Sequence, residues 1–173
     1  FSFLPTILNS LSVSIVGKIL TTNQRKMCFE TDRTIDNHNK LSKNKTDQYK
    51  YPAVQTGNNI LWSSKKCKKH DHPKIIVSAS GYPDVIKDDN GRYSVTKSYF
   101  MLTEGEEENN YIETLLNLKL YKWILKTCKW SGFNSKLTLD ILPYPKNIQS
   151  DQDIYSCLNL TQEEINFIEE IIK

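Results

Sequence analysis

The chain has 173 residues, which fits one domain, and 38% of them are hydrophobic, which is enough to build a core. The formal net charge is only +3, so the overall balance excludes a uniformly basic or acidic protein. No apolar run is long enough to span a membrane, and four widely separated cysteines argue against a disulfide scaffold. We therefore expect an intracellular protein in a reducing compartment, with no membrane partner.

The first element expected is a helix over residues 9–21, because apolar side chains recur at near-helical spacing from Leu8 to Ile19. Residues 31–59 are polar and rich in Asn, Asp and other turn formers, so we predict a long irregular connection there. A connection of this length within a compact domain is usually functional or mobile.

Positive charge is concentrated in residues 40–74, which hold nine lysines against two aspartates, a local balance of +7. Residues 75–173 sum to −5. Five of the nine lysines lie in SSKKCKKHDHPK, residues 63–74. A basic segment on a mildly acidic body is typical of a surface that binds a polyanion. The alternative is a lysine-rich loop that is only solvated.

Short strands are expected on both sides of this basic segment, at residues 60–62 and 75–77. Asn90–Gly91 then lies between two extended runs, which is the strongest short-range signal of a β-hairpin. The return run of that hairpin is RYSVTKSYFML, residues 92–102.

The second half of the chain indicates mainly helices. Residues 109–129 carry a helical apolar stripe and a neighbouring stripe of lysines, so we predict one long helix. Residues 137–142 are interpreted as a strand that Pro143 ends. A capping-box sequence at residues 161–164 begins a short amphipathic helix.

These elements predict an α+β fold: a twisted mixed or antiparallel sheet with one long packed helix at about 109–129 and a helical C-terminal tail. We expect one domain in three parts. Residues 1–59 supply the N-terminal helix and the connection, residues 60–148 the core, and residues 149–173 the tail.

The sequence contains no self-contained active site. It has no glycine-rich phosphate loop and no GxSxG nucleophile motif. Cys67, His70 and His72 lack a fourth ligand nearby, and their spacing is not a recurring zinc pattern. We therefore predict no catalytic, cofactor-binding or metal-binding residues in this chain.

The positive features suit double-stranded DNA. The lysines of residues 63–74 can neutralise phosphates, which gives affinity without sequence information. The predicted hairpin carries Lys87, Arg92 and Lys97, which are long enough to reach base edges in the major groove. Tyr82 and Trp130 lie at glycine turns where an aromatic ring can pack on a sugar or base, although simple core or rim packing is the alternative.

The order of motifs adds a resemblance. A strand and serine-rich turn (KIIVSASGY), a return run (YSVTKSYFML), a helix (YIETLLNLKLYKWILKTC), then WSGF and a strand ending in LPYP follow one another. This order resembles the target-recognition region of restriction-modification DNA methyltransferases that modify the exocyclic amine of adenine, closest to the type II modification methylases and their large-DNA-virus versions. That family commonly carries Leu-Asn-Ser-Lys-Leu in the helix, and Leu116–Leu120 matches with Leu at the third position. The resemblance covers Ile60 to the C-terminus and, more weakly, the initial FSFLP.

The resemblance implies that residues 60–148 are a target-recognition core that binds double-stranded DNA sequence-specifically. Methyl transfer and S-adenosylmethionine binding would belong to a catalytic domain, linked or separate, because this chain has no Asn-Pro-Pro-Tyr-type motif. The chain alone would then not be an enzyme, and it would act in the cytoplasm of a microbe or of a virus-infected cell. The candidate DNA-contacting residues are Lys65, Lys66, Lys68, Lys69, Ser80, Tyr82, Lys87, Arg92, Lys97, Lys129, Trp130 and Ser131.

Two other functions stay open. One is a fragment of a bifunctional restriction endonuclease and methylase, which needs a carboxylate–lysine metal cluster that the sequence does not show. The other is a non-enzymatic protein-interaction domain whose lysines are only solvated.

Overall fold

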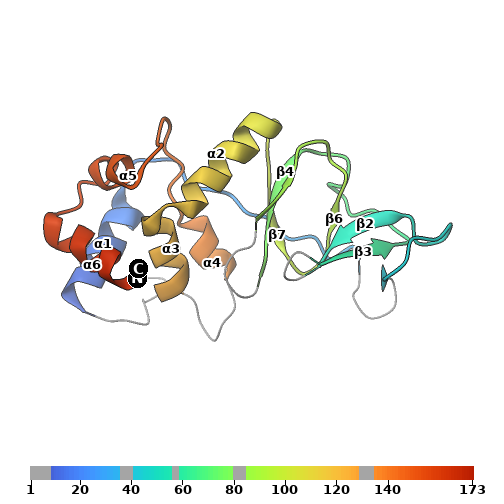
Figure 1. Ribbon diagram of the computed structural model, residues 1–173, viewed down its shortest axis with the longest axis horizontal. Helices are drawn as coiled ribbons and strands as arrows, with labels where there is room; N and C mark the ends of the chain where they lie inside the picture. Colours follow the sequence, from blue (N-terminus) through green and yellow to red (C-terminus); the bar gives the residue numbers. More distant parts are fainter. Residues whose placement is uncertain (1–8, 36–40, 56–58, 80–84, 129–134) are drawn as a thin grey trace. The chain divides into compact units, whose positions relative to one another are not determined.

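The computed structural model describes residues 9–35, 41–55, 59–79, 85–128 and 135–173 (Figure 1). These residues contain six helices and seven strands, which confirms the predicted α+β class. They form two compact units: unit 1 holds the residues up to Cys28 and those from Glu113 onward, and unit 2 holds Phe29–Ile112. The three-part division expected from the sequence stays a prediction.

Unit 2 contains two small sheets. The first is antiparallel with the order β5-β4-β7, built from β4 (Lys74–Val77), β5 (Val85–Asp88) and β7 (Tyr99–Leu102). The second is mixed with the order β1-β3-β2-β6, built from β1 (Leu41–Ser42), β2 (Tyr51–Val54), β3 (Ile60–Ser63) and β6 (Ser94–Val95).

The core of unit 2 joins the two sheets. Val54 and Val95 from the mixed sheet pack with Ile76 and Phe100 from the antiparallel sheet, and all four side chains are buried. Strand β4 is the central strand of its sheet and is buried along its whole length, as the apolar run in KIIV predicts.

The predicted hairpin at Asn90–Gly91 is wrong, although a turn is present there. Strand β5 pairs with β4, whereas β6 pairs in parallel with β2 in the other sheet. The physical reason is Asp88, whose carboxylate accepts hydrogen bonds from the backbone N–H groups of Arg92 (2.6 Å) and Tyr93 (2.9 Å). These donors are therefore not used to extend a ladder with β5, and the chain crosses to the second sheet.

The long irregular connection predicted over residues 31–59 also needs correction, because it contains β1 and β2. The apolar end of YPAV explains β2, since Ala53 and Val54 are buried. Pro52 lies within this strand although proline cannot donate a backbone hydrogen bond. It is accommodated because β6 pairs only with Ala53 and Val54, so no β6 partner faces Pro52.

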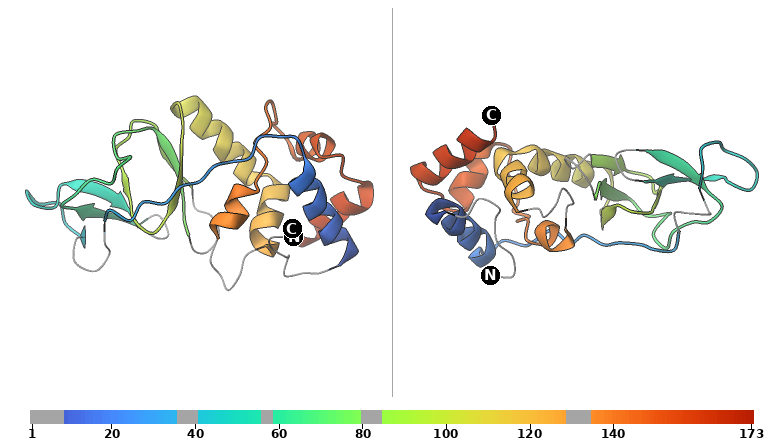
Figure 2. Two further views of the ribbon diagram at one scale, coloured as in Figure 1. Left: turned by 180° about the vertical axis from the view of Figure 1, so that it is seen from behind. Right: turned by 90° about the horizontal axis from the view of Figure 1, so that it is seen from below.

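Unit 1 is helical. It contains α1 (Ser10–Thr21), the end of α2 (Glu106–Asn117), α3 (Lys119–Thr127), α4 (Lys136–Asp140), α5 (Asp151–Cys157) and α6 (Gln162–Ile171). Helices α1 and α6 lie side by side (Figure 2). Both were predicted, and both begin with a capping box, formed by Asn9 with Ser12 and by Thr161 with Glu164.

The single helix predicted over 109–129 is interrupted at Leu118 and becomes α2 and α3. Leu118 is extended, with φ −68° and ψ 149°, and has no side-chain cap of its own. The Asp151 carboxylate instead accepts from the Lys119 N–H at 2.6 Å, so a distant acidic residue satisfies the start of α3. Lys129 lies outside the described residues.

The strand predicted over 137–142 is wrong, because α4 occupies this segment. Ser135 caps the helix by accepting from the Thr138 N–H, and Lys136 pairs with Asp140 one turn later. Thr138 and Leu139 are buried while Leu137 is 59% exposed, a helical pattern rather than a strand alternation.

No helix in the described ranges is long and apolar enough to cross a membrane. All four cysteines are free thiols. These findings agree with the absence of a disulfide scaffold that the cysteine spacing predicted.

Candidate nucleic-acid interface

The predicted basic segment forms a loop between β3 and β4, residues 64–73, which we call the lysine loop. It carries four of the candidate DNA-contacting residues. Lys65, Lys66 and Lys68 are exposed, and Lys69 is half-buried. Cys67 and His70 between them are buried, so the loop alternates between side chains held in unit 2 and cations directed to solvent.

Buried acceptors hold the backbone of the lysine loop in place. The Cys67 N–H donates to the Ser94 hydroxyl at 3.0 Å, and Nδ1 of His70 lies 2.8 Å from the same oxygen. The Lys68 N–H donates to the Asp32 carboxylate at 2.9 Å. Ser94 and Asp32 are themselves buried. The lysines therefore extend from a fixed backbone and not from a freely moving loop.

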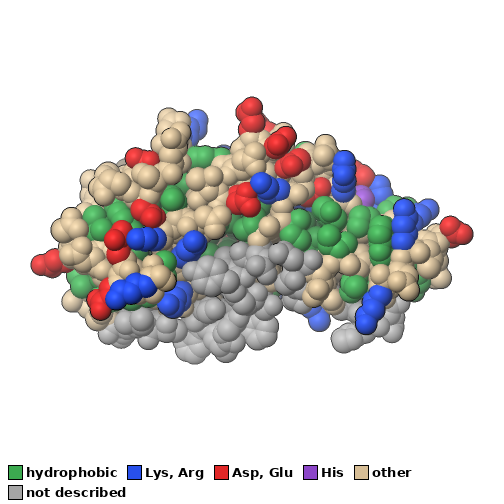
Figure 3. All heavy atoms as spheres, in the orientation of Figure 1, with side chains coloured by type: hydrophobic (Ala, Val, Ile, Leu, Met, Phe, Trp, Pro, Cys, Tyr) green, Lys and Arg blue, Asp and Glu red, His purple; other side chains and the backbone are tan. Residues whose placement is uncertain are grey.

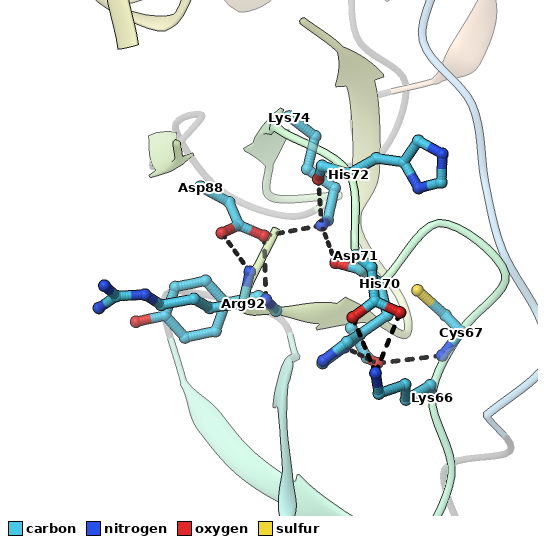
Figure 4. A network of polar contacts seen from close by, with 10 residues as sticks. Lys66, Cys67, His70, Asp71, His72, Lys74, Asp88 and Arg92 are labelled. Atoms are coloured by element: carbon cyan, nitrogen blue, oxygen red, sulfur yellow. Dashed lines mark hydrogen bonds and ion pairs between the residues drawn. The ribbon is translucent and has the colours of Figure 1, made fainter. Parts of the chain in front are cut away.

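A buried ion pair fixes the end of the loop (Figure 4). Lys74 Nζ lies 2.7 Å from Asp88, and the two side chains are 0% and 1% exposed. Lys74 also donates to the carbonyls of His70 and His72, at 3.0 and 2.9 Å. A buried pair is stable only when further hydrogen bonds satisfy both charges, and Lys74 and Asp88 meet that condition.

The turn at Gly91 is in direct backbone contact with the lysine loop. Gly91 has φ +65°, and a Cβ atom placed on it would lie 2.4 Å from the Asp71 carbonyl carbon and 2.6 Å from the His72 nitrogen. No side chain fits there. The loop and the turn that carries exposed Arg92 are thus held together, and Figure 4 shows the Arg92 side chain extending away from the loop.

One lysine of the loop is already partly neutralised. Lys66 lies 2.7 Å from Asp71, and this hydrogen bond is the main reason that the pKa of Asp71 is lowered. Lys66 also lies over the Tyr51 ring, 5.5 Å from its centre. Lys65, Lys68 and Lys69 form no ion pair with the described residues, so their charges are the more available to a polyanion.

Cations on aromatic rings near the loop were not predicted as site residues. Lys50 lies 5.4 Å from the Tyr51 ring centre, and Lys45 lies 5.3 Å from that of Trp62. On the face drawn in Figure 3, several lysine and arginine side chains lie along the edges of a hydrophobic area of unit 2. The sequence signal for these pairs was the lysine density of residues 40–74, but the ring contacts depend on the fold.

Two adjacent pockets lie beside the segment Thr31–Thr34. The first has a volume of about 540 Å³ and is lined by Thr31, Arg33, Ile35, Thr96, Lys97, Ser98 and Tyr99. The second has about 460 Å³ and is lined by Glu30, Thr31, Asp32, Arg33, Thr34, Lys68, Lys69 and Phe100. Thr31 and Arg33 line both. Lys97 therefore lines one pocket, Lys68 and Lys69 of the lysine loop line the neighbouring pocket, and Arg33 lines both.

Asp32 is a carboxylate of this surface that stays ionised, and the protein's own donors hold its charge. Burial opposes its ionisation, but hydrogen bonds from Thr34 and Lys68 and the charge of Lys68 outweigh burial and lower its pKa. Its two oxygens accept the backbone N–H groups of Thr34 (2.7 Å) and Lys68 (2.9 Å). The carboxylate is thus held by the protein itself.

The other predicted site residues are placed as follows. Lys87 is exposed on β5 and donates to the Asn110 side chain at 2.9 Å. Arg33 lines both pockets but was not among the predicted site residues, because nothing in its sequence neighbourhood distinguishes it from other surface charges. The candidates that lie outside the described residues are Ser80, Tyr82, Lys129, Trp130 and Ser131.

The side chains considered for a metal do not converge. The His70 ring contacts the Ser94 hydroxyl, whereas Cys67 reaches that hydroxyl through its backbone N–H and not through its thiol. Figure 4 shows His72 pointing away from both residues. Within the part of the chain that the structure describes, no group of three or more His, Cys, Asp or Glu side chains could hold a metal ion.

The buried His70 should make unit 2 less stable in mild acid. Burial first, and then the charge of Lys66, lowers its pKa below 6.5, although Asp71 opposes them. The unfolded chain then takes up a proton near pH 6.5 while the folded state does not, so stability present above that pH falls as the pH drops toward the folded pKa. Unfolding measured between about pH 7.5 and about pH 5 should show this slope. His70→Asn should flatten it, and the matched change at exposed His72 should not.

Neither a protein-family model nor a curated protein matches this chain, so its function is inferred from the residues described above.

Proposed function

We propose that unit 2 binds double-stranded DNA, and that the chain is the target-recognition part of an adenine-specific DNA methyltransferase. The observation that carries the DNA proposal is the lysine loop, which presents Lys65, Lys68 and Lys69 from a backbone fixed by buried Asp32, Ser94 and Lys74. Cations held in this way can meet phosphates with a smaller ordering cost than lysines on a mobile loop.

Affinity in this proposal comes mainly from the DNA backbone. Each lysine that neutralises a phosphate releases counterions, which makes binding strong at low salt and weak at high salt. Lys66 would contribute less than its neighbours because Asp71 already pairs with it. Asp71 would have to release Lys66 before that lysine could hold a phosphate.

Base recognition rests on a smaller part of the site than the sequence suggested. The two-stranded hairpin expected to enter the major groove does not form, which removes the reason for expecting Lys87 and Lys97 to reach base edges. For Arg92 a different reason remains, because the Asp88 carboxylate fixes its backbone N–H at the turn while its side chain is exposed. We propose Arg92 as the base-contacting residue of the described surface.

The methyltransferase context is supported by the ordered motifs of the sequence. Methyl transfer and S-adenosylmethionine binding would belong to a catalytic domain outside this chain, linked or separate, that extrudes the target adenine from the duplex. We propose that the assembly works in the cytoplasm of a microbe or of a virus-infected cell, which the four free cysteines support.

Replacing Lys68 and Lys69 with glutamine should weaken DNA binding equally for all sequences. Each lost phosphate contact lowers the slope of log affinity against log salt by about 0.9 on B-form DNA, so the double variant should lower it by roughly 2. Fluorescence anisotropy of the 173-residue chain with a labelled duplex, at several salt concentrations, measures this slope.

The matched control is Lys146→Gln with Lys173→Gln, which removes the same charge from exposed positions of unit 1. Its slope should stay at the unmodified value. Absence of binding by the unmodified chain at low salt would contradict the proposal and favour a protein-interaction domain. An equal loss in both variants would show that only net charge matters.

A further inference from the structure

The first of the two pockets has a lining suited to an anion. Among the described residues it holds two cations, four hydroxyl groups and one apolar side chain, and no carboxylate. Its cations, Arg33 and Lys97, come from segments far apart in the sequence. Lys97 was expected to reach base edges from a hairpin, and that hairpin is absent.

Lys97 is presented from an anchored bend. The residues on either side, Thr96 and Ser98, are buried, whereas Lys97 is exposed. The Thr96 N–H and hydroxyl both donate to the Val54 carbonyl at 3.1 Å, and the Ser98 hydroxyl donates to the Gln55 carbonyl at 3.4 Å. The backbone that carries Lys97 is therefore tied to β2 and the residue after it.

Arg33 is presented in the same way. Glu30 and Phe100 exchange backbone hydrogen bonds at 2.6 and 3.0 Å, which attaches the start of its segment to β7. Asp32 is held by the N–H groups of Thr34 and Lys68, and Ile35 is buried. Arg33 is thus an exposed cation between two fixed residues, Asp32 and Ile35.

We propose that this pocket is a phosphate-binding site in which Arg33 and Lys97 hold one phosphate group. The guanidinium can donate two parallel hydrogen bonds to phosphate oxygens, and the ammonium adds a point charge. The hydroxyl of Thr31, which lines the same pocket, is a further donor. Lys97 then contacts the nucleic-acid backbone and carries no sequence information.

The assignment of this phosphate to DNA rests on the proposed function. Arg33 and Thr31 also line the second pocket, beside Lys68 and Lys69, so the phosphate site adjoins the lysine loop. An internal phosphodiester of a duplex or a terminal phosphate monoester would supply the same chemistry. Binding of inorganic phosphate does not depend on the DNA proposal, which makes the two ideas separable.

The test is a titration of the full chain with inorganic phosphate, followed through the backbone amide signals by NMR. Signals of Thr31, Arg33 and Lys97 should shift and saturate. Arg33→Gln with Lys97→Gln should weaken this binding by about tenfold or more, since both charge-assisted contacts to the phosphate are lost. The control, Arg25→Gln with Lys146→Gln, removes one Arg and one Lys from unit 1 and should bind phosphate normally.

Duplexes with and without a 5′-phosphate identify the source. An equal loss of affinity for both duplexes in the Arg33/Lys97 variant assigns the site to internal phosphodiesters, and a loss only with the 5′-phosphate assigns it to strand ends. Phosphate shifts that are absent, or that persist in the Arg33/Lys97 variant, would overturn the site. Normal DNA binding with that result would leave the proposed function intact, because the lysine loop would carry it alone.

Discussion

Replacing Lys74 with methionine should reduce the unfolding free energy of unit 2 by about 3–5 kcal/mol, the usual cost of leaving one member of a buried ion pair without its partner. The Asp88 carboxylate is 1% exposed and would lose its counter-ion, while the carbonyls of His70 and His72 would lose their donor. Chemical unfolding followed by circular dichroism, with hydrogen exchange of the β4 amides, measures the loss in unit 2.

The structure offers two controls for this prediction. Lys66→Met removes an exposed partner of Asp71, whose side chain is 69% exposed, and should change the stability of unit 2 little, because solvent screens exposed ion pairs. Lys74→Met combined with Asp88→Asn removes both buried charges and should recover part of the loss. If Lys74→Met cost no more than Lys66→Met, the buried pair would not be the anchor of the lysine loop.

The elements predicted well from the sequence are those whose signals are local. The caps of α1 and α6 lie within three residues of the helices that they begin. In β4, Ile75–Val77 form an apolar run that is buried. Propensity and spacing act over a few residues, so such segments keep their predicted structure when the rest of the chain folds.

The errors depend on residues far away in the sequence. The long helix is interrupted at Leu118, and the Lys119 N–H that follows donates to Asp151, thirty-two positions after Lys119. The Asn90–Gly91 turn was found, but the partner of each flanking strand depends on Asp88 and on the order of two sheets. The helical pattern of residues 109–129 and the turn signal at Asn90–Gly91 are both present in the sequence. Neither contains the distant contact that ends the helix or selects the strand partner.

The candidate site also has a part that was predictable from local sequence and a part that depends on distant segments. Charge density identified the lysine loop, because nine lysines in residues 40–74 are visible without a fold. The pocket of Arg33 and Lys97 was not foreseeable, since it exists only when residues 31–35 and 96–99 meet. Lys97 was predicted as a site residue for a reason that the strand pairing removes, and the pocket gives it a different proposed role.

Replacing Gly91 with alanine should also destabilise unit 2, for two additive reasons. A residue with φ +65° costs about 1–2 kcal/mol when it carries a Cβ. The added atom would in addition meet backbone atoms of Asp71 and His72 at 2.4 and 2.6 Å, which side-chain rotation cannot relieve. Overpacking of this kind typically costs a further 1–3 kcal/mol or so, so we expect a total of about 2–5 kcal/mol by thermal unfolding.

Two other glycines separate these contributions. Gly105 has φ +131° with open space around its Cβ position, so Gly105→Ala should show backbone strain without the clash. Gly17 lies inside α1 with nothing within 4 Å, and Gly17→Ala should stabilise the chain by about 0.5–1 kcal/mol. The clash should also push the lysine loop away from the turn and speed exchange of the Cys67 amide, which donates to Ser94. A Gly91→Ala chain with the stability of Gly105→Ala and unchanged Cys67 exchange would mean that the loop and turn do not support each other, and the fixed presentation of the loop lysines would lose its main support.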